Sequence, residues 1–415
     1  MAWIRVLIPS LWIVAYYCAT VKGWEREITS ELNPGCPDIL CNGTFRIAHI
    51  KAKGPNDTLH YVWDLTKKPS LLLALTTHNA TVSFDWDCIG NGKECSMSFS
   101  EKPLYRFGIV FNKMWEFNDV NDTGIFDQTN KSNSYVRVLN TEHFSWNRTV
   151  FDQDSRSVSI GVKSEKYVNG NTVKNGTVKL LVKGFGYLDH SEMLPHLLHT
   201  PNTSQVDFVI DGLTTEPSFS NSRFALELVL VGSDQTASNI QIVEHQSLDD
   251  EHAPGVFTLV DVETPDSAGS AKGGYLQWRP VAYISSVRDV ANSTDATIYS
   301  PQNVTNPVED LKGTLVLSGF CSNDTGTETC LNATLVQATA VSFGLKEDGF
   351  YKKTKYMAWT FTMGYGKPPD EDFSLLVILV ISIGLGLPAL LIIVSGLVML
   401  IRRVSRKKDD LFLGR

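Results

Sequence analysis

The sequence predicts an all-β fold: a lumenal antiparallel β-sandwich region, as one large or two packed sandwiches, followed by a single C-terminal transmembrane helix. Three observations support this prediction. Short runs of Val, Ile, Leu and aromatic residues recur between turn residues before position 373, which is typical of sandwiches. One long apolar stretch lies near the C-terminus, and N-glycosylation motifs are abundant before that stretch but absent after it.

The strand prediction depends on residue alternation within these runs. The run that begins at Phe224 reads Phe-Ala-Leu-Glu-Leu-Val-Leu, which fits a strand with one buried face. Outside the membrane span, no stretch of twelve or more residues has helical periodicity. The expected strands are Phe45–Lys53, Leu59–Leu65, Leu71–Thr77, Thr81–Trp86, Phe107–Phe111, Val158–Val162, Val178–Val182, Phe208–Ile210, Phe224–Val231, Val256–Val262, Tyr275–Tyr283, Thr314–Leu317, Leu335–Phe343 and Met357–Met363.

The N-terminus reads as a signal peptide over residues 1–23. Arg5 supplies its positive region and the apolar run Val6–Ala19 follows, with cleavage expected after Gly23 in preference to Ala19. The alternative is an uncleaved anchor. The lumenal region then divides into an N-terminal half, 24–190, and a C-terminal half, 205–372. The polar segment between them carries two prolines and a glycosylation motif, which makes it the candidate junction.

The transmembrane helix is expected over Phe373–Ile401, a stretch without a charged residue that is long enough to cross a hydrocarbon core of about 30 Å. Acidic residues precede it and basic residues follow it, so the positive-inside rule leaves residues 402–415 as a cytosolic tail. The protein is therefore predicted to be type I. Ser382 and Gly386 form a small-xxx-small pair, which would let a partner helix approach closely.

Twelve Asn-x-Ser/Thr motifs lie before the membrane span. Because glycans are added in the secretory lumen and are bulky and polar, each occupied motif must be on the lumenal surface. The predicted glycosylation sites are Asn42, Asn56, Asn79, Asn121, Asn130, Asn147, Asn175, Asn202, Asn292, Asn303, Asn323 and Asn332.

Six cysteines remain once Cys18 leaves with the signal peptide. They are Cys36 and Cys41, Cys88 and Cys95, and Cys321 and Cys330. Sequence alone does not decide their connectivity, but proximity and an oxidising lumen favour three local disulfides. A metal site is the rival interpretation, and no CxxC motif or paired histidine accompanies these cysteines.

Charge and motifs narrow the function classes. The whole chain has a formal net charge of −8, and because the leader and the tail are basic the lumenal region is more acidic still. This balance argues against nucleic acid or an anionic membrane surface as a partner. The sequence contains no G-x-S-x-G, H-E-x-x-H, P-loop or dinucleotide-binding motif, so no catalytic residue, cofactor or metal is predicted. A carboxylate pair of the glycosidase type stays open.

The most unusual polar segment is Glu244–Pro254. Its Asp249, Asp250 and Glu251 could supply oxygen ligands to Ca²⁺, and His245 and His252 could titrate in an acidic compartment. The plainer interpretation is a charged loop before a strand.

The run Leu276–Tyr283 contains Trp278 and Arg279, residue types that are favoured at interfaces, although a Trp on a strand more often belongs to the core. No glycosylation motif occurs between Asn202 and Asn292, and this gap contains the run. A glycan-free docking face is therefore the hypothesis, with Trp278, Arg279, Ser382 and Gly386 as partner-binding residues.

Several segments in order along the chain resemble the glycosylated lysosomal membrane protein family. The resemblance spans essentially the whole lumenal region and the membrane helix. It is carried by Asn56–Trp63, Phe144–Asn147, Leu197–Thr200, the acidic loop through Ala253–Pro254, and Gln277–Tyr283.

The resemblance implies a single-pass type I protein of the lysosomal membrane without enzyme activity. It would be an accessory subunit of a multi-spanning lysosomal transporter of the major facilitator superfamily that exports dipeptides. The lumenal domain would shield that transporter from proteases. One departure is the tail: family members can end with a Tyr-based sorting signal, but Asp409–Arg415 contains no Tyr. Sorting together with the transporter would replace such a signal.

Two alternatives stay open. A membrane-tethered lumenal hydrolase would show a deep pocket with two converging carboxylates or a nucleophile beside a histidine. A Ca²⁺-dependent cell-surface adhesion protein would use the acidic loop to bind the ion.

Overall fold

The computed structural model describes residues 25–41, 46–91, 97–232, 239–249, 255–264, 273–321, 327–370 and 375–412. The predicted signal peptide lies outside these ranges. The chain divides into two compact units, Met1–His245 with Thr258–Pro369 and Gln246–Phe257 with Asp370–Arg415.

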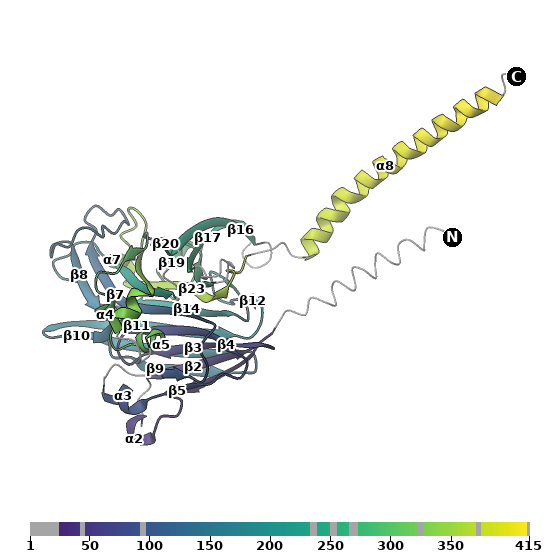
Figure 1. Cartoon of the computed structure of the whole chain (residues 1–415). Helices are drawn as coiled ribbons and strands as arrows, with labels where there is room; N and C mark the ends of the chain where they lie inside the picture. The colour runs from purple at the N-terminus through teal and green to yellow at the C-terminus, as the bar shows by residue number, and fades with distance from the viewer. Residues whose placement is uncertain are drawn as a thin grey trace. The chain divides into compact units, whose positions relative to one another are not determined.

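The first unit contains two antiparallel sheets, whose strands are labelled in Figure 1. The first sheet runs in the order β1-β2-β3-β4-β7-β15-β22. Its strands are β1 (Glu27–Leu32), β2 (Ile47–Lys53), β3 (Asp57–Asp64), β4 (Ser70–Thr77), β7 (Tyr105–Asn118), β15 (Ser222–Gly232) and β22 (Leu335–Phe343). Strand β8 (Val136–Asn140) pairs with the second half of β7.

The second sheet runs in the order β9-β10-β11-β14-β23-β18-β17. Its strands are β9 (Asn147–Gln153), β10 (Ser157–Asn169), β11 (Thr172–Phe185), β14 (Thr203–Asp211), β23 (Tyr356–Gly366), β18 (Gly273–Trp278) and β17 (Gly255–Thr264). Strand β16 (Gln241–Asp249) precedes β17 in the chain.

Short strands connect the two sheets at one edge. Strand β19 (Val281–Tyr283) pairs with β23 of the second sheet and with β20 (Ser293–Ile298). Strand β20 in turn pairs with β22 of the first sheet. The predicted all-β class is therefore confirmed, with a nearly closed antiparallel arrangement.

Both halves of the lumenal sequence contribute to both sheets. Strand β15 pairs with β7, and β14 pairs with β11, so strands from either side of the candidate junction are direct neighbours. The segment between the halves contains a short hairpin, β12 (Asp189–His190) with β13 (Leu198–His199). It does not separate two independent sheets.

The main core lies between the two sheets. Phe111 of β7 faces Phe361 of β23, with ring centroids 6.3 Å apart, and both side chains are buried. Along β15, Leu226, Leu228 and Leu230 join this core, whereas Val229 belongs to a second cluster on the opposite face. The alternation in the sequence thus places side chains on two faces, and both faces are covered.

Short helices and a hairpin cover the outer face of the first sheet. They are α4 (Pro307–Leu311), α5 (Leu315–Phe320), α6 (Thr327–Asn332), and β5 (Val82–Phe84) with β6 (Met97–Phe99). The strand predicted at Thr314–Leu317 is wrong, because this segment begins α5. The Thr314 hydroxyl accepts a hydrogen bond from the Leu317 amide, which is the N-cap arrangement that favours a helix.

The remaining short elements are α2 (Asp38–Cys41), α3 (Trp86–Asn91), η1 (Thr141–His143), η2 (Val290–Asn292), β21 (Gln302–Asn303) and α7 (Phe350–Thr354). In the second unit, α8 (Leu375–Phe412) is one continuous helix that contains Pro388. Its segment Ile383–Arg403 is the one candidate membrane span among the described residues. It overlaps the predicted span and begins later in the chain.

Candidate functional site

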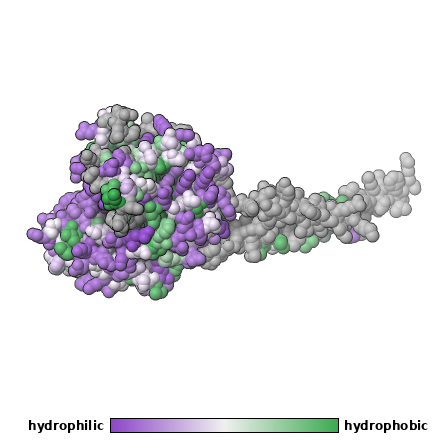
Figure 2. Space-filling view, turned by 90° about the horizontal axis from the view of Figure 1, so that it is seen from below, coloured by the Kyte–Doolittle hydropathy of each residue, from purple (hydrophilic) through white to green (hydrophobic). Residues whose placement is uncertain are grey.

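The glycosylation motifs lie on the accessible surface of the first unit. Ten of the twelve asparagines fall within the described residues, where seven are exposed, three are half-buried and none is buried. Asn42 and Asn323 lie outside these ranges. On the face drawn in Figure 2, hydrophilic residues predominate and hydrophobic residues form small separate groups. Exposure is what a glycan requires, and which sites are occupied stays a prediction.

Two of these asparagines have amide oxygens held by buried side chains. Asn202 Oδ1 accepts from Arg26 Nε at 2.8 Å, and Asn303 Oδ1 accepts from Gln337 Nε2 at 2.9 Å. Arg26 and Gln337 are both buried. Each hydrogen bond engages the amide oxygen and so fixes the orientation of the side-chain amide. The amide nitrogen Nδ2, the atom that carries an N-linked glycan, points away from that bond.

Two of the three expected local cysteine pairs are present as disulfides. Cys36 is joined to Cys41 with Cα atoms 6.2 Å apart, and Cys321 is joined to Cys330 with Cα atoms 5.6 Å apart. The second bridge links the end of α5 to α6. Cys95 lies outside the described residues, so its pairing with Cys88 stays a prediction.

The structure places Trp278 and Arg279 in the interior, so the partner-binding hypothesis gains no support at these two residues. Trp278 is fully buried in the main core, where its ring meets Trp359 edge-on with centroids 5.4 Å apart. Arg279 is 8% exposed. Neither side chain offers a surface to a partner, and the interpretation as core residues holds. Ser382 and Gly386 lie on α8, and their contact with a partner helix stays a prediction.

The acidic loop is described only in part. His245 Nδ1 lies 3.5 Å from Asp261 Oδ2, and the Ser247 hydroxyl donates to Asp370 Oδ1 at 3.0 Å. The suggested Ca²⁺ ligands Asp250 and Glu251, and His252, lie outside the described residues, as does the side chain of Asp249. Across the part of the chain that the structure describes, no group of three or more His, Cys, Asp or Glu side chains is placed to hold a metal.

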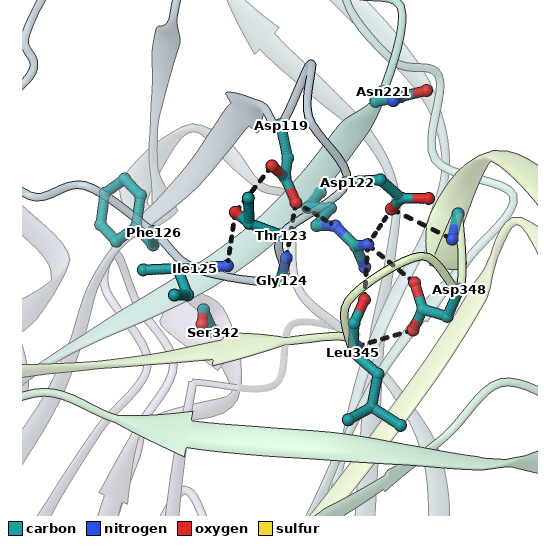
Figure 3. A network of polar contacts seen from close by, with 12 residues as sticks. Asp119, Asp122, Thr123, Gly124, Ile125, Phe126, Asn221, Ser342, Leu345 and Asp348 are labelled. Carbon is teal, nitrogen blue, oxygen red and sulfur yellow. Dashed lines mark hydrogen bonds and ion pairs between the residues drawn. The ribbon is translucent and has the colours of Figure 1, made fainter.

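A buried arginine gathers three carboxylates, as Figure 3 shows. Arg223 lies on β15 with its side chain 1% exposed. Its Nε donates to Asp119 Oδ2 at 2.8 Å, and its terminal nitrogen pairs with Asp122 and, at 2.7 Å, with Asp348. The same nitrogen donates to the Leu345 carbonyl at 2.9 Å. The guanidinium thereby joins the turn after β7 to the turn after β22.

The carboxylates of this cluster also organise backbone around them. Asp119 accepts from the Thr123 hydroxyl at 2.9 Å and from the Gly124 amide at 2.7 Å. Burial opposes ionisation of Asp348, but bonds from the Leu345 amide, Arg223 and Thr294 hold its pKa below the ordinary value. Thr123 is the third residue of the Asn121 motif. The cluster therefore shapes a glycosylation turn.

A polar pocket of about 290 Å³ opens between the first sheet and α4, and Lys113, Trp115, Glu227 and Asp310 are among its lining residues. Glu227 and Asp310 each accept from Asn112 Nδ2 at 2.8 Å. Each also accepts from Lys113 Nζ, at 3.2 and 3.3 Å. Burial disfavours the Lys113 charge, but the two carboxylates raise its pKa above the ordinary value. Lys113 is therefore held in its charged form between the carboxylates of Glu227 and Asp310.

A second pocket, of about 370 Å³, is lined by Glu31, His49, Lys51 and His60. Burial, with a contribution from Lys51, lowers the pKa of His49 to about 4. Burial, His49 and Lys51 lower the pKa of His60 to about 3. These imidazoles are held neutral in the folded protein, because burial penalises the charged form.

The family model described as "Glycosylated lysosomal membrane protein" matches residues 46–406. The chain belongs to the glycosylated lysosomal membrane protein family. A relative from Danio rerio with that name is 30% identical and covers 96% of this chain and 95% of its own length. Glycosylated lysosomal membrane protein B from Xenopus laevis is 27% identical over 94% of both chains. The Homo sapiens relative is 28% identical over 91% of this chain and 88% of its own.

Membership in the glycosylated lysosomal membrane protein family places the chain in the lysosomal membrane. Helix α8 fits a single-pass anchor, with the large β unit on the lumenal side and the basic tail in the cytosol. The family is named as a membrane protein and not as an enzyme.

The sequence did not single out Arg223, Glu227 or Asp310. The available signal was a charged residue inside an apolar strand run, as with Glu227 in the run that begins at Phe224. Such a residue needs a partner when the strand is covered on both faces. The partners themselves are distant in sequence, so the pocket and the arginine cluster could not be located.

Proposed function

We propose that this protein is a non-enzymatic accessory subunit of a multi-spanning lysosomal transporter of the major facilitator superfamily that exports dipeptides. Its lumenal unit shields the transporter from proteolysis. The main support is the distribution of the glycosylation motifs: every one within the described ranges reaches the surface of a continuous, hydrogen-bonded β body. Proteases cut exposed flexible segments, and glycans over paired strands leave few of these.

The membrane helix provides the second support. The small residues Ser382 and Gly386 lie about one helical turn apart on α8, so they share one face of the helix. Small residues let transmembrane helices pack closely where lipid provides no hydrophobic drive. Helix α8 is therefore suited to lateral packing against a multi-spanning partner through Ser382 and Gly386.

Affinity purification from detergent-solubilised lysosomes tests the partnership. A multi-spanning transporter should co-elute with the full chain. Gly386→Leu should reduce its recovery, whereas Gly384→Leu, on the opposite helix face, serves as the matched control. Equal recovery with both variants would rule out the Ser382/Gly386 stripe as the contact.

A chase experiment tests the shielding role. In cells that lack this chain, the lysosomal half-life of the co-eluting transporter should fall several-fold, and inhibition of lysosomal proteases should restore it. An unchanged half-life in those cells would contradict the proposed function.

One observation favours the tethered-hydrolase alternative. Glu227 and Asp310 converge in a pocket, and a carboxylate pair is what glycoside hydrolysis uses. Purified full-length protein and its Glu227→Gln variant should be assayed on aryl glycosides between pH 4 and 7. Hydrolysis that the substitution abolishes would establish this alternative.

A further inference from the structure

A predicted glycosylation motif forms part of the wall of the polar pocket. Asn303 and Thr305, the first and third residues of the motif, both line the cavity of about 290 Å³. Asn303 lies on β21, which is paired with β22 through Asn303 and Gln337. The backbone of the motif is therefore fixed relative to the sheet that forms the pocket.

The orientation of the Asn303 amide is also fixed. Gln337 is 2% exposed, and its Oε1 accepts from the Ile240 amide at 2.9 Å. Its Nε2 donates to Asn303 Oδ1 at 2.9 Å and to Asn239 Oδ1 at 3.0 Å. Because both ends of the Gln337 amide are bonded, Asn303 presents its oxygen to Gln337 and its Nδ2 is left for a glycan.

The pocket has the chemistry of a sugar site. Trp115 and Phe126 are 8% and 3% exposed and give the lining a small apolar part. Lys131 Nζ lies 4.4 Å from the Trp115 ring centroid, where its ammonium can donate to a hydroxyl group of a ligand. Glu227 and Asp310 provide acceptors, and Gln128 adds an amide. Lys113 pairs with both carboxylates, and Lys131 is the second cation of the lining, so the formal charges of the lining residues sum to zero. A balanced charge favours a neutral, hydroxylated ligand with one apolar face over an ion.

We propose that the pocket holds the proximal N-acetylglucosamine of the glycan on Asn303 itself. The volume is close to the lower limit of about 300 Å³ for small-ligand sites, which suits one sugar residue. Covalent attachment keeps that residue beside the pocket at an effective concentration in the millimolar range, so a dissociation constant of about 0.1 mM for the free sugar gives roughly tenfold protection of the attached one. The docked glycan covers the exposed strand β21. Docking needs no transporter, so this proposal is independent of the proposed function.

Glycan release from the native full-length protein tests the proposal. Release by a peptide N-glycosidase is followed at each site by mass spectrometry, with exposed Asn332 as the internal control. Release at Asn303 should be roughly tenfold slower than at Asn332, the ratio that a docking free energy of about 1.4 kcal/mol produces. The two rates should become equal after denaturation.

Two variants assign the protection to the pocket. Gln128→Ala and Lys131→Ala alter accessible residues, and Lys131→Ala preserves the Asn130 motif. Both should accelerate release at Asn303 and leave Asn332 unchanged. Equal native rates at the two sites, an unoccupied Asn303, or protection that neither variant reduces would each overturn the proposal.

Slow release at Asn303 could also arise if neighbouring residues block the glycosidase. Binding of a free sugar to protein that lacks this glycan separates the two causes. Asn303→Gln protein should bind free N,N′-diacetylchitobiose weakly and saturably, and Lys131→Ala in that background should abolish binding. No binding at concentrations of about 10 mM, above the tethered effective concentration, would contradict a sugar-binding pocket.

Discussion

His49 and His60 lie side by side on adjacent strands, with rings inclined by 17° and His49 Nε2 2.9 Å from His60 Nδ1. His60 Nε2 lies 3.0 Å from the Thr76 hydroxyl, which donates to the Thr77 carbonyl at 3.0 Å. Because the Thr76 hydroxyl proton is already donated to the Thr77 carbonyl, the Thr76 oxygen can only accept from His60 Nε2. His60 Nδ1 therefore carries no proton and accepts from His49 Nε2. The tautomers are thus assigned by the network, and protonating His60 Nδ1 would break it.

We predict that this pair makes the protein less stable as the pH falls from 6.5 towards 4. The pKa values in the folded protein, about 4 for His49 and about 3 for His60, lie below the value of about 6.5 in the unfolded chain. Below pH 6.5 the unfolded state therefore binds more protons. At pH 5, the lowered pKa of His60 reduces the free energy of unfolding by about 2 kcal/mol relative to its value at neutral pH.

The substitution His60→Gln isolates this effect, because a glutamine can accept from His49 and donate to Thr76 without titrating. Unfolding free energies measured from pH 7 to 4.5 should decline less steeply for His60→Gln than for the natural protein. His143→Gln, at a partly exposed histidine, is the control. Identical slopes for His60→Gln and the natural protein would contradict the assignment.

Arg223→Met should be among the most destabilising single substitutions. It leaves Asp119, Asp122 and Asp348 without their shared cation, and removing one partner of a buried pair costs about 3–5 kcal/mol. Denaturant unfolding should show this loss, whereas Arg148→Met on the exposed strand β9 should change stability by less than about 0.5 kcal/mol. Adding Asp348→Asn to Arg223→Met should recover part of the loss, and no recovery would argue against charge as the cause.

The contrast between β15 and the Arg223 cluster shows what the sequence could predict. Alternating residues in the run from Phe224 predict a strand, because side chains point to opposite faces with period two. Arg223 finds Asp119 only through the pairing of β15 with β7, and Asp348 only because β22 flanks β15 on its other side. Pairings between strands more than a hundred residues apart leave no local pattern.

The error at Thr314–Leu317 has a different cause. A run of four residues is too short for periodicity to separate a strand from a helical turn. The deciding features are the Thr314 cap and contacts with the sheet below. Glycosylation motifs and the membrane span, in contrast, are defined by adjacent residues and were readable directly.

Two glycines allow α5 to lie directly on the first sheet. A Cβ at Gly108 of β7 would lie 2.4 Å from Val316 Cγ1, and one at Gly319 of α5 would lie 2.2 Å from Leu72 Cδ2. Gly108→Ala and Gly319→Ala should each cost about 1–3 kcal/mol of stability through overpacking. Gly232→Ala should be tolerated, since its nearest neighbours are 3.7 Å away. Thermal unfolding measures the difference, and the double variant Gly108→Ala with Val316→Ala should be more stable than Gly108→Ala alone.

Asn202 should contribute to folding independently of its glycan. Its Oδ1 accepts from Arg26 Nε at 2.8 Å, and Arg26 Nη1 also pairs with Asp57 at 2.6 Å. Asn202→Ala and Asn202→Asp both remove the glycan, but only aspartate keeps an acceptor for the buried guanidinium. The alanine variant should therefore be less stable than the aspartate variant by about 1.5–3 kcal/mol, the range for hydrogen bonds to charged groups. The same two substitutions at exposed Asn79 should differ little, and an equally small difference at Asn202 would mean that the motif contributes only its glycan.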